Sequence, residues 1–202
     1  MATLTDVTTA SILVRGGLER VRAVVDRLDR ETWVAPTEGD WTLVLPDAPA
    51  PAEARDEVDP YDLVGLGRAL CHHGIDQVLI LSVQHGYGVG QLMSRRHDTA
   101  FIGWRSAQSG EPPASRVDPD AYGFCARYGV PERTELVELL LEDVSGTPDL
   151  RLADLCRALG LPVSAVGVTG AMLAEERAHL AGAERHRRRR TGRWTGLRRL
   201  VG

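Results

Sequence analysis

The glycine series Gly86, Gly88 and Gly90 is the first pattern that could do chemistry, because it follows the apolar run 78–83. Glycines after a buried strand can cradle a phosphate when a helix begins directly behind them. Only eight residues separate Gly90 from the next strand-like run, 99–104, whereas a parallel crossover needs about a dozen or more. A hairpin turn explains the glycines without a ligand. We therefore predict a β-hairpin here and no nucleotide site.

Histidines are the second group of candidates: His85 and His97 beside the predicted turn, and His72 and His73 after Cys71. Zinc ligands usually come from positions whose side chains converge, such as i and i+4 on a helix. Adjacent helical residues diverge by about 100°, so His72 and His73 do not suit one ion. We predict no metal site and no cofactor. His85 and His97 are the candidates for a general base if the protein is an enzyme, although no Ser or Cys nucleophile motif accompanies them.

The segment 155–166 has the spacing of a DNA-binding motif. It resembles the helix-turn-helix family, with Gly160 at the turn and apolar residues at the motif's hydrophobic positions, namely Leu155, Leu159, Leu161 and Val166. The resemblance covers about 20 residues and implies a recognition helix over roughly 163–170. That helix would carry no Arg, Gln or Asn to read base edges. The alternatives are a structural helix pair and a strand over 165–168.

The C-terminal segment is the most unusual stretch, because its last 18 residues contain eight arginines and no acidic residue. Its apolar residues recur at intervals that suit a small basic amphipathic helix. Such a segment can bind an acidic protein, the phosphates of a nucleic acid or an anionic membrane surface, or fold back on the rest of the chain. The candidate binding residues are Arg187, Arg188, Arg189, Arg190, Arg193, Trp194, Arg198 and Arg199.

Composition limits the remaining possibilities. The 202 residues are 43% hydrophobic but only 5% aromatic, which predicts one domain with a core of Leu, Val and Ala. The net charge of −4 combines −12 over residues 1–184 with +8 over the last 18 residues. Three cysteines form no disulfide framework, and the sequence shows no signal peptide and no apolar run near 18 residues. We therefore expect a cytoplasmic protein with reduced thiols and no transmembrane segment.

All 24 basic residues are arginines, and asparagine is also absent. Lysine and asparagine both have A-rich codons, so their joint absence indicates a GC-rich bacterial genome. Avoidance of lysine-directed modification would explain the missing lysines but not the missing asparagines.

Hydrophobic periodicity and turn residues predict the elements that position these groups. Residues 1–10 are expected to be frayed, 32–45 to form a hairpin with Trp41, Leu43 and Leu45 on one face, and 76–106 to form a β-meander. Asp59-Pro60 and Asp118-Pro119 are expected to begin helices. The predicted helices cover about 17–29, 59–73, 119–128, 132–144, 149–159 and 164–190. In the helix at 132–144, we expect Leu136, Leu139, Leu140 and Leu141 to be buried.

Together these elements predict an α+β fold with a small antiparallel sheet from about 32–45 and 76–106, flanked by helices. The domain would cover 1–184, sheet-rich over 17–106 and helical over 119–184, with 185–202 as a flexible arginine-rich tail. The leading functional hypothesis is a non-enzymatic cytosolic protein that acts through protein–protein contacts, such as an adaptor or immunity-type factor. One alternative is a nucleic-acid-associated regulator that uses the tail and the segment 155–166. The other is an enzyme with a pocket near 85–97.

Overall fold

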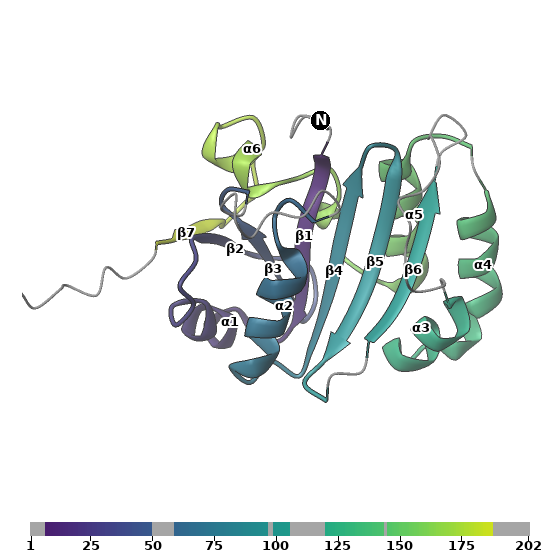
Figure 1. Ribbon diagram of the computed structural model, residues 1–202, viewed down its shortest axis with the longest axis horizontal. Helices are drawn as coiled ribbons and strands as arrows, with labels where there is room; N and C mark the ends of the chain where they lie inside the picture. Colours follow the sequence, from purple (N-terminus) through teal and green to yellow (C-terminus); the bar gives the residue numbers. More distant parts are fainter. Residues whose placement is uncertain (1–6, 50–58, 97–98, 106–119, 144, 188–202) are drawn as a thin grey trace, which may run out of the picture.

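The computed structural model describes residues 7–49, 59–96, 99–105, 120–143 and 145–187. A seven-stranded antiparallel sheet with the order β6-β5-β4-β1-β3-β2-β7 lies at its centre, with helices on both faces (Figure 1). The protein therefore has the α+β fold that the sequence predicts, with a larger sheet than expected. The strands are β1 (Val7–Arg15), β2 (Thr32–Pro36), β3 (Trp41–Pro46), β4 (Gln77–Gln84), β5 (Tyr87–Ser94), β6 (Thr99–Arg105) and β7 (Glu184–His186).

The central strand β1 corrects the prediction for the start of the chain. Residues 7–10 belong to this strand, which pairs with β3 on one side and β4 on the other. Ile12, Leu13 and Val14 are fully buried because helices cover both faces of the sheet at this point. The polar residues Thr9 and Ser11 are buried too, and they hydrogen-bond to the chain at 165–167. This long-range partner makes small polar residues acceptable in a central strand.

The predicted meander is confirmed as β4, β5 and β6. The β4–β5 hairpin pairs from Gln77 with Ser94 to Gln84 with Tyr87. His85 and Gly86 form its two-residue turn with φ of 49° and 82°, which are the positive angles that a type I′ turn requires. Strand β4 lies between β1 and β5, away from both edges of the sheet. Its nearly continuous apolar sequence therefore reflects burial on both faces.

Two helices, α1 (Leu18–Val25) and α2 (Leu63–His72), cover one face of the sheet. Val44 faces this layer, whereas Trp41, Leu43 and Leu45 face the other one, as the alternation in β3 predicts. The N-cap of α2 is Asp62, not Asp59. The carboxylate of Asp59 nevertheless accepts hydrogen bonds from the backbone N–H groups of Leu63 and Val64. Both acids thus satisfy the first turn of this helix.

The other face is covered by the C-terminal half of the chain. Its helices are α3 (Ala121–Tyr128), η3 (Pro131–Arg133), α4 (Thr134–Glu142), α5 (Pro148–Leu159), η4 (Val163–Ala165) and α6 (Gly170–Ala174). Asp120 is the N-cap of α3, two residues beyond the Asp118 expected from the sequence, and Gly129 ends the helix with φ of 94°. Thr147 caps α5 and Gly160 ends it, as expected. Phe124, Leu152 and Leu155 fill the core beneath these helices.

The long helix predicted over 164–190 does not form. The short helices η4 and α6 occupy its first part, and β7 then adds a strand to β2 at the edge of the sheet. Gly167 and Gly182 have φ of 71°, a left-handed conformation that interrupts a helix and suits glycine. Arg185 and His186, which the sequence assigns to the tail, therefore belong to the sheet. Among the helices of the described residues, none is long and apolar enough to cross a lipid bilayer.

Candidate functional site

Helix α4 exposes two leucines that the sequence places in the core. Leu136 is 41% exposed and Leu139 is 66% exposed, whereas Val137 is fully buried and Leu140 and Leu141 are partly buried. The reason is geometric: at about 100° per residue, the five apolar residues among positions 136–141 spread over about 200° of the helix and cannot all face one side. Val137, Leu140 and Leu141 take the inner side. Leu136 and Leu139 remain one turn apart on the surface.

Glutamates lie beside these leucines on α4. We define the α4 face as Leu136 and Leu139 together with Glu135, Glu138 and Glu142, all of which are exposed. None of the three carboxylates forms an ion pair with another described residue, and neither does Glu132 one turn earlier. The α4 face therefore places negative charge beside two exposed leucines.

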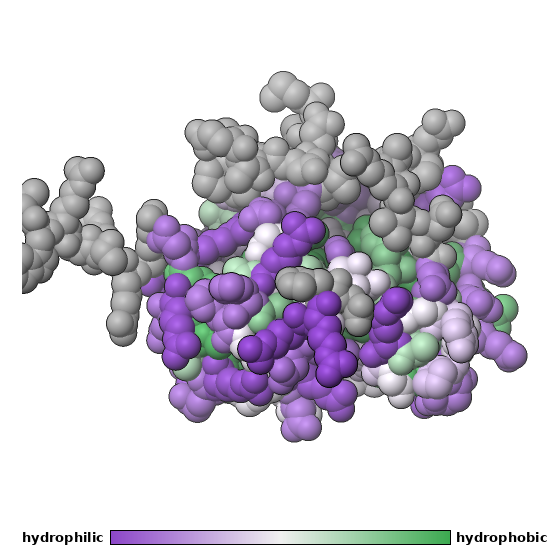
Figure 2. Space-filling model, turned by 60° about the horizontal axis from the view of Figure 1, so that its bottom comes forward, coloured by the Kyte–Doolittle hydropathy of each residue, from purple (hydrophilic) through white to green (hydrophobic). Residues whose placement is uncertain are grey.

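Acidic residues elsewhere in the described structure are more often paired. Near α1, Glu19 and Glu184 both pair with Arg22, and Asp76 pairs with Arg20. Figure 2 shows the lower end of the molecule, where hydrophilic side chains dominate and hydrophobic surface is confined to small, separate areas. Exposed leucines beside carboxylates that have no ion pair among the described residues thus distinguish α4 from the α1 side of the molecule.

A buried arginine holds the C-terminal end of α4 in place. The Arg151 side chain is only 6% exposed and forms an ion pair with Asp143 at 2.7 Å. Its guanidinium also donates hydrogen bonds to the backbone oxygen of Leu140 at 2.9 Å and to that of Ser145. Hydrogen bonds from Ser145 and from Arg151 lower the pKa of Asp143 to about 2. Because Arg151 belongs to α5, these contacts fix the C-terminal end of α4 to the neighbouring helix. The α4 face therefore lies on a helix that is held in place by tertiary contacts.

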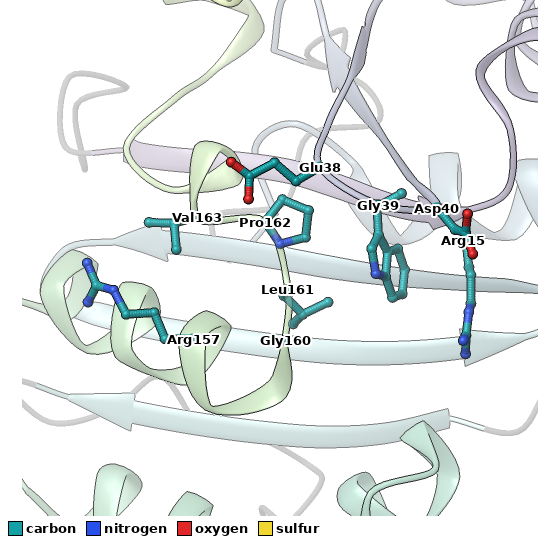
Figure 3. A pocket seen from close by; sticks show the side chains of 10 residues that line it. Arg15, Glu38, Gly39, Asp40, Arg157, Gly160, Leu161, Pro162 and Val163 are labelled. Atoms are coloured by element: carbon teal, nitrogen blue, oxygen red, sulfur yellow. The ribbon is translucent and has the colours of Figure 1, made fainter.

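A second feature is a groove of about 490 Å³ between the β2–β3 turn and the C-terminal end of α5 (Figure 3). Trp41, Leu161 and Pro162 contribute apolar surface to its lining. Arg15 and Asp40 lie at one end, and Arg157 lies at the other. The remaining lining residues are Glu38, Gly39, Gly160 and Val163.

The groove offers no set of groups that defines a reaction. Its lining has two arginines and two carboxylates, so neither sign of charge prevails, and Arg157 already pairs with Asp154 at 2.6 Å. None of its lining residues is a serine, threonine, cysteine or histidine. Trp41 stacks against Tyr128 with ring centroids 6.1 Å apart, so the aromatic surface is already in contact with α3. This arrangement suits a weak polar contact better than catalysis.

His85 lies far from this groove. It follows Gln84, which pairs with Val7 at the start of β1, whereas the groove adjoins Arg15 at the end of β1. His97 lies outside the described residues. His72 and His73 place their rings edge to face with centroids 5.5 Å apart, and within the described chain no group of three or more His, Cys, Asp or Glu could hold a metal ion. Among the described histidines, His72 and His73 precede β4 and His85 follows it, so the structure does not bring them together.

The three cysteines are buried and carry protonated thiols at neutral pH. Burial raises the pKa of Cys71 to about 11 and that of Cys156 to about 12, and it also raises the pKa of Cys125. A thiol must lose its proton to act as a nucleophile or a metal ligand. These cysteines are core residues.

The helix-turn-helix interpretation of 155–166 is wrong. Helix α5 and the turn at Gly160 are present, but the would-be recognition helix is only the three-residue η4. The strand alternative over 165–168 does not form either. The backbone N–H of Ala10 donates to the carbonyl of Val168 at 3.1 Å. This contact and the bonds of Thr9 and Ser11 place the segment against β1, where it packs as part of the core.

Among the candidate residues of the tail, only Arg187 is described, and it is exposed. The others, Arg188, Arg189, Arg190, Arg193, Trp194, Arg198 and Arg199, lie outside the described residues. The preceding strand β7 is held by charge. Arg185 pairs with Glu31 at 3.1 Å and with Asp47, and His186 lies 2.9 Å from Asp26. The start of the arginine-rich segment is thus fixed at the β2 edge of the sheet.

Comparison with known proteins assigns no family. The chain matches no protein-family model, no curated protein and no solved structure.

Proposed function

We propose that this protein acts by binding another protein without catalysing a reaction, as an adaptor or immunity-type factor, and that the α4 face is its contact surface. The observation that supports this proposal is the exposure of Leu136 and Leu139 one turn apart, beside glutamates that form no ion pair with another described residue. Single exposed apolar residues are common on protein surfaces. Two on one helix face form a small apolar patch that a partner can cover.

Energetics favour a partner that is both apolar and basic. Covering two leucines that are roughly half exposed gains on the order of 2 kcal/mol. That gain alone is small against the cost of association. Arginine or lysine side chains beside Glu135, Glu138 and Glu142 would speed encounter and select the partner. The surface therefore suits a basic amphipathic helix or strand.

Catalysis has less support. The buried thiols are protonated, the groove beside Trp41 lacks a nucleophile of the serine, threonine or cysteine type, and His85 lies at the opposite end of β1. The nucleic-acid alternative is supported only by the arginines of the C-terminal segment, because the expected recognition helix is replaced by the three-residue η4. A cytoplasmic location agrees with a partner-binding role and belongs to the same proposal.

The test compares three full-length proteins at native expression level: the natural chain, the double variant Leu136→Gln/Leu139→Gln, and Leu150→Gln. Leu150 is 62% exposed on α5, so it controls for the loss of an exposed leucine outside the α4 face. We expect at least one protein to be captured about tenfold less by the double variant than by the other two chains. Rebinding must then occur with purified components. Equal capture by all three chains would show that the α4 face is not the contact surface.

A further inference from the structure

We propose that the occupant of the α4 face is the arginine-rich segment 187–202 of a second copy of this chain. This inference rests on the proposed function and names the partner of the same surface. It follows from the chemistry of the two surfaces and from where the segment begins.

The two surfaces complement each other in charge and apolarity. Residues 187–202 contain seven arginines and no acidic residue, and their apolar members are Trp194, Leu197, Leu200 and Val201. The α4 face offers three carboxylates without an ion pair among the described residues and two exposed leucines. Guanidinium groups pair well with carboxylates, and tryptophan covers apolar surface at a small entropic cost. Each side supplies what the other lacks.

The acids nearest the beginning of the segment are already engaged. Arg185 pairs with Glu31 and Asp47, and His186 lies beside Asp26. Trp33 also donates from Nε1 to Asp47 at 2.6 Å. Carboxylates that pair with the arginines that follow are therefore expected to be ones other than these three.

The α4 face of the same copy lies too far away for the first part of the segment. Strand β7 and helix α4 lie at opposite ends of the long axis of the molecule (Figure 1), and α4 packs against the far edge strand β6. Six strand spacings of about 4.8 Å separate β7 from β6, which gives about 29 Å. From Arg187 to Trp194 a fully extended chain spans only about 23 Å. The backbone at Trp194 therefore stops short of the α4 face of its own copy, which favours the α4 face of a neighbouring copy as the contact.

A contact of this kind joins two different surfaces of the same chain. Each copy keeps one free α4 face and one free segment after the first contact, so assembly continues until a ring closes or the row of copies ends. Self-association should increase with protein concentration. It should also weaken with salt, because the charged groups are exposed.

Photo-crosslinking tests the assignment directly. p-Benzoylphenylalanine replaces Trp194 in a full-length chain of normal isotopic composition, and this chain is mixed with the full-length natural chain labelled with ¹⁵N. We expect the probe to crosslink to the labelled tryptic peptide 134–151, which contains α4. The yield should fall at least about tenfold when the labelled chain carries Leu136→Gln/Leu139→Gln, and when NaCl rises from about 0.1 to about 1 M. Leu150→Gln in the labelled chain should leave the yield unchanged.

Other outcomes would overturn the assignment. Crosslinks confined to one isotopic form would show that the segment contacts its own copy. Crosslinks to any other labelled peptide, or yields insensitive to the double variant, would show that the segment does not occupy the α4 face. The crosslinking can fail in this way while the capture experiment still shows a protein that binds the natural chain but not the double variant. In that case the α4 face binds a different protein and the proposed function stands. If neither experiment responds to the double variant, both proposals fail.

Discussion

The indole ring of Trp104 occupies the space in which a side chain at position 88 would begin. A Cβ atom built on Gly88 would lie 1.9 Å from Cε2 of Trp104. The two residues face each other across the β5–β6 ladder, and Nε1 of Trp104 donates to the backbone oxygen of Pro148 at 3.1 Å. A glycine opposite an aromatic residue lets the ring lie over the neighbouring strand. Packing of the sheet against α5, rather than ligand binding, explains this glycine.

Substitution of Gly88 should therefore disrupt the sheet. We expect Gly88→Ala to lower the free energy of unfolding by about 3 kcal/mol, because the ring must leave its position and its hydrogen bond to Pro148. Gly103→Ala is the matched control on β6, where the nearest side-chain atom would be 3.4 Å away. Its effect should stay within about 0.5 kcal/mol. Urea unfolding monitored by tryptophan fluorescence measures both, and equal effects would contradict this account of the glycine.

Stability should reveal which apolar residues of α4 face inward. Val137→Ala should lower the free energy of unfolding by about 2 kcal/mol, since it removes two buried methyl groups. Leu139→Gln should change it by no more than about 0.5 kcal/mol, because this side chain is 66% exposed. Chemical denaturation of the two variants provides the measurement. If Leu139→Gln were the more damaging change, Leu139 would be a core residue and the α4 face would not exist.

The contact between Asp143 and Arg151 should make stability depend on pH. Hydrogen bonds from Ser145 and from Arg151 lower the pKa of Asp143 from 3.8 to about 2 in the folded protein. A carboxyl group with a lowered folded pKa stabilises the protein above its unfolded pKa, and this contribution is lost as the pH falls through the folded value. Asp143→Asn should therefore be less stable than the natural chain at pH 7, and the difference should shrink between about pH 4 and pH 2.

Urea titrations across this pH range test that expectation. Glu142→Gln is the control, because its carboxylate has no ion pair among the described residues. A difference between Asp143→Asn and the natural chain that stays constant down to about pH 2 would show that the Arg151 contact does not act through ionised Asp143.

The ion pairs of Arg185 should hold β7 on the sheet. The side chain of Asp47 is only 8% exposed and accepts hydrogen bonds from Arg185 and from Trp33 Nε1. Arg185→Gln removes the charged partner of this nearly buried carboxylate and should cost about 1.5 kcal/mol. Hydrogen exchange should then become faster in β2, whose outer edge pairs with β7. Arg187 lies two residues later and is exposed, so Arg187→Gln should leave hydrogen exchange in β2 unchanged. Equal exchange rates in the two variants would show that the ion pairs of Arg185 do not hold β7 on the sheet.

The parts of the fold that the sequence predicts are those set by local patterns. The β4–β5 hairpin follows from an apolar run and a glycine turn, and α5 follows from Thr147-Pro148 at one end and Gly160 at the other. The sequence does not predict strand β1, because polar residues such as Thr9 and Ser11 are typical of the protein surface. Their hydrogen bonds go to Asp149 and to residues 165–167, more than 130 positions away, and only the folded chain reveals them.

The candidate site was predictable only in part. The segregation of acid and arginine along the chain indicates a binding role for the C-terminal segment, but the sequence assigns Leu136 and Leu139 to the core. A helical projection of 136–141 would have shown that the five apolar side chains spread over about 200° of the helix and that some must be exposed. Which of them are exposed depends on how α4 packs against α5 and β6, and that is set by tertiary contacts such as those of Arg151.

The position of β1 has a consequence for how the protein is made. Ile12 pairs with Val44 and with Ile80, so the partners of this strand leave the ribosome 32 and 68 residues later. Until then both edges of an apolar strand are open to pairing with other nascent chains. Non-local pairing of this kind also slows folding. Production of this protein should therefore be sensitive to chaperone supply during translation, even if the finished domain is stable.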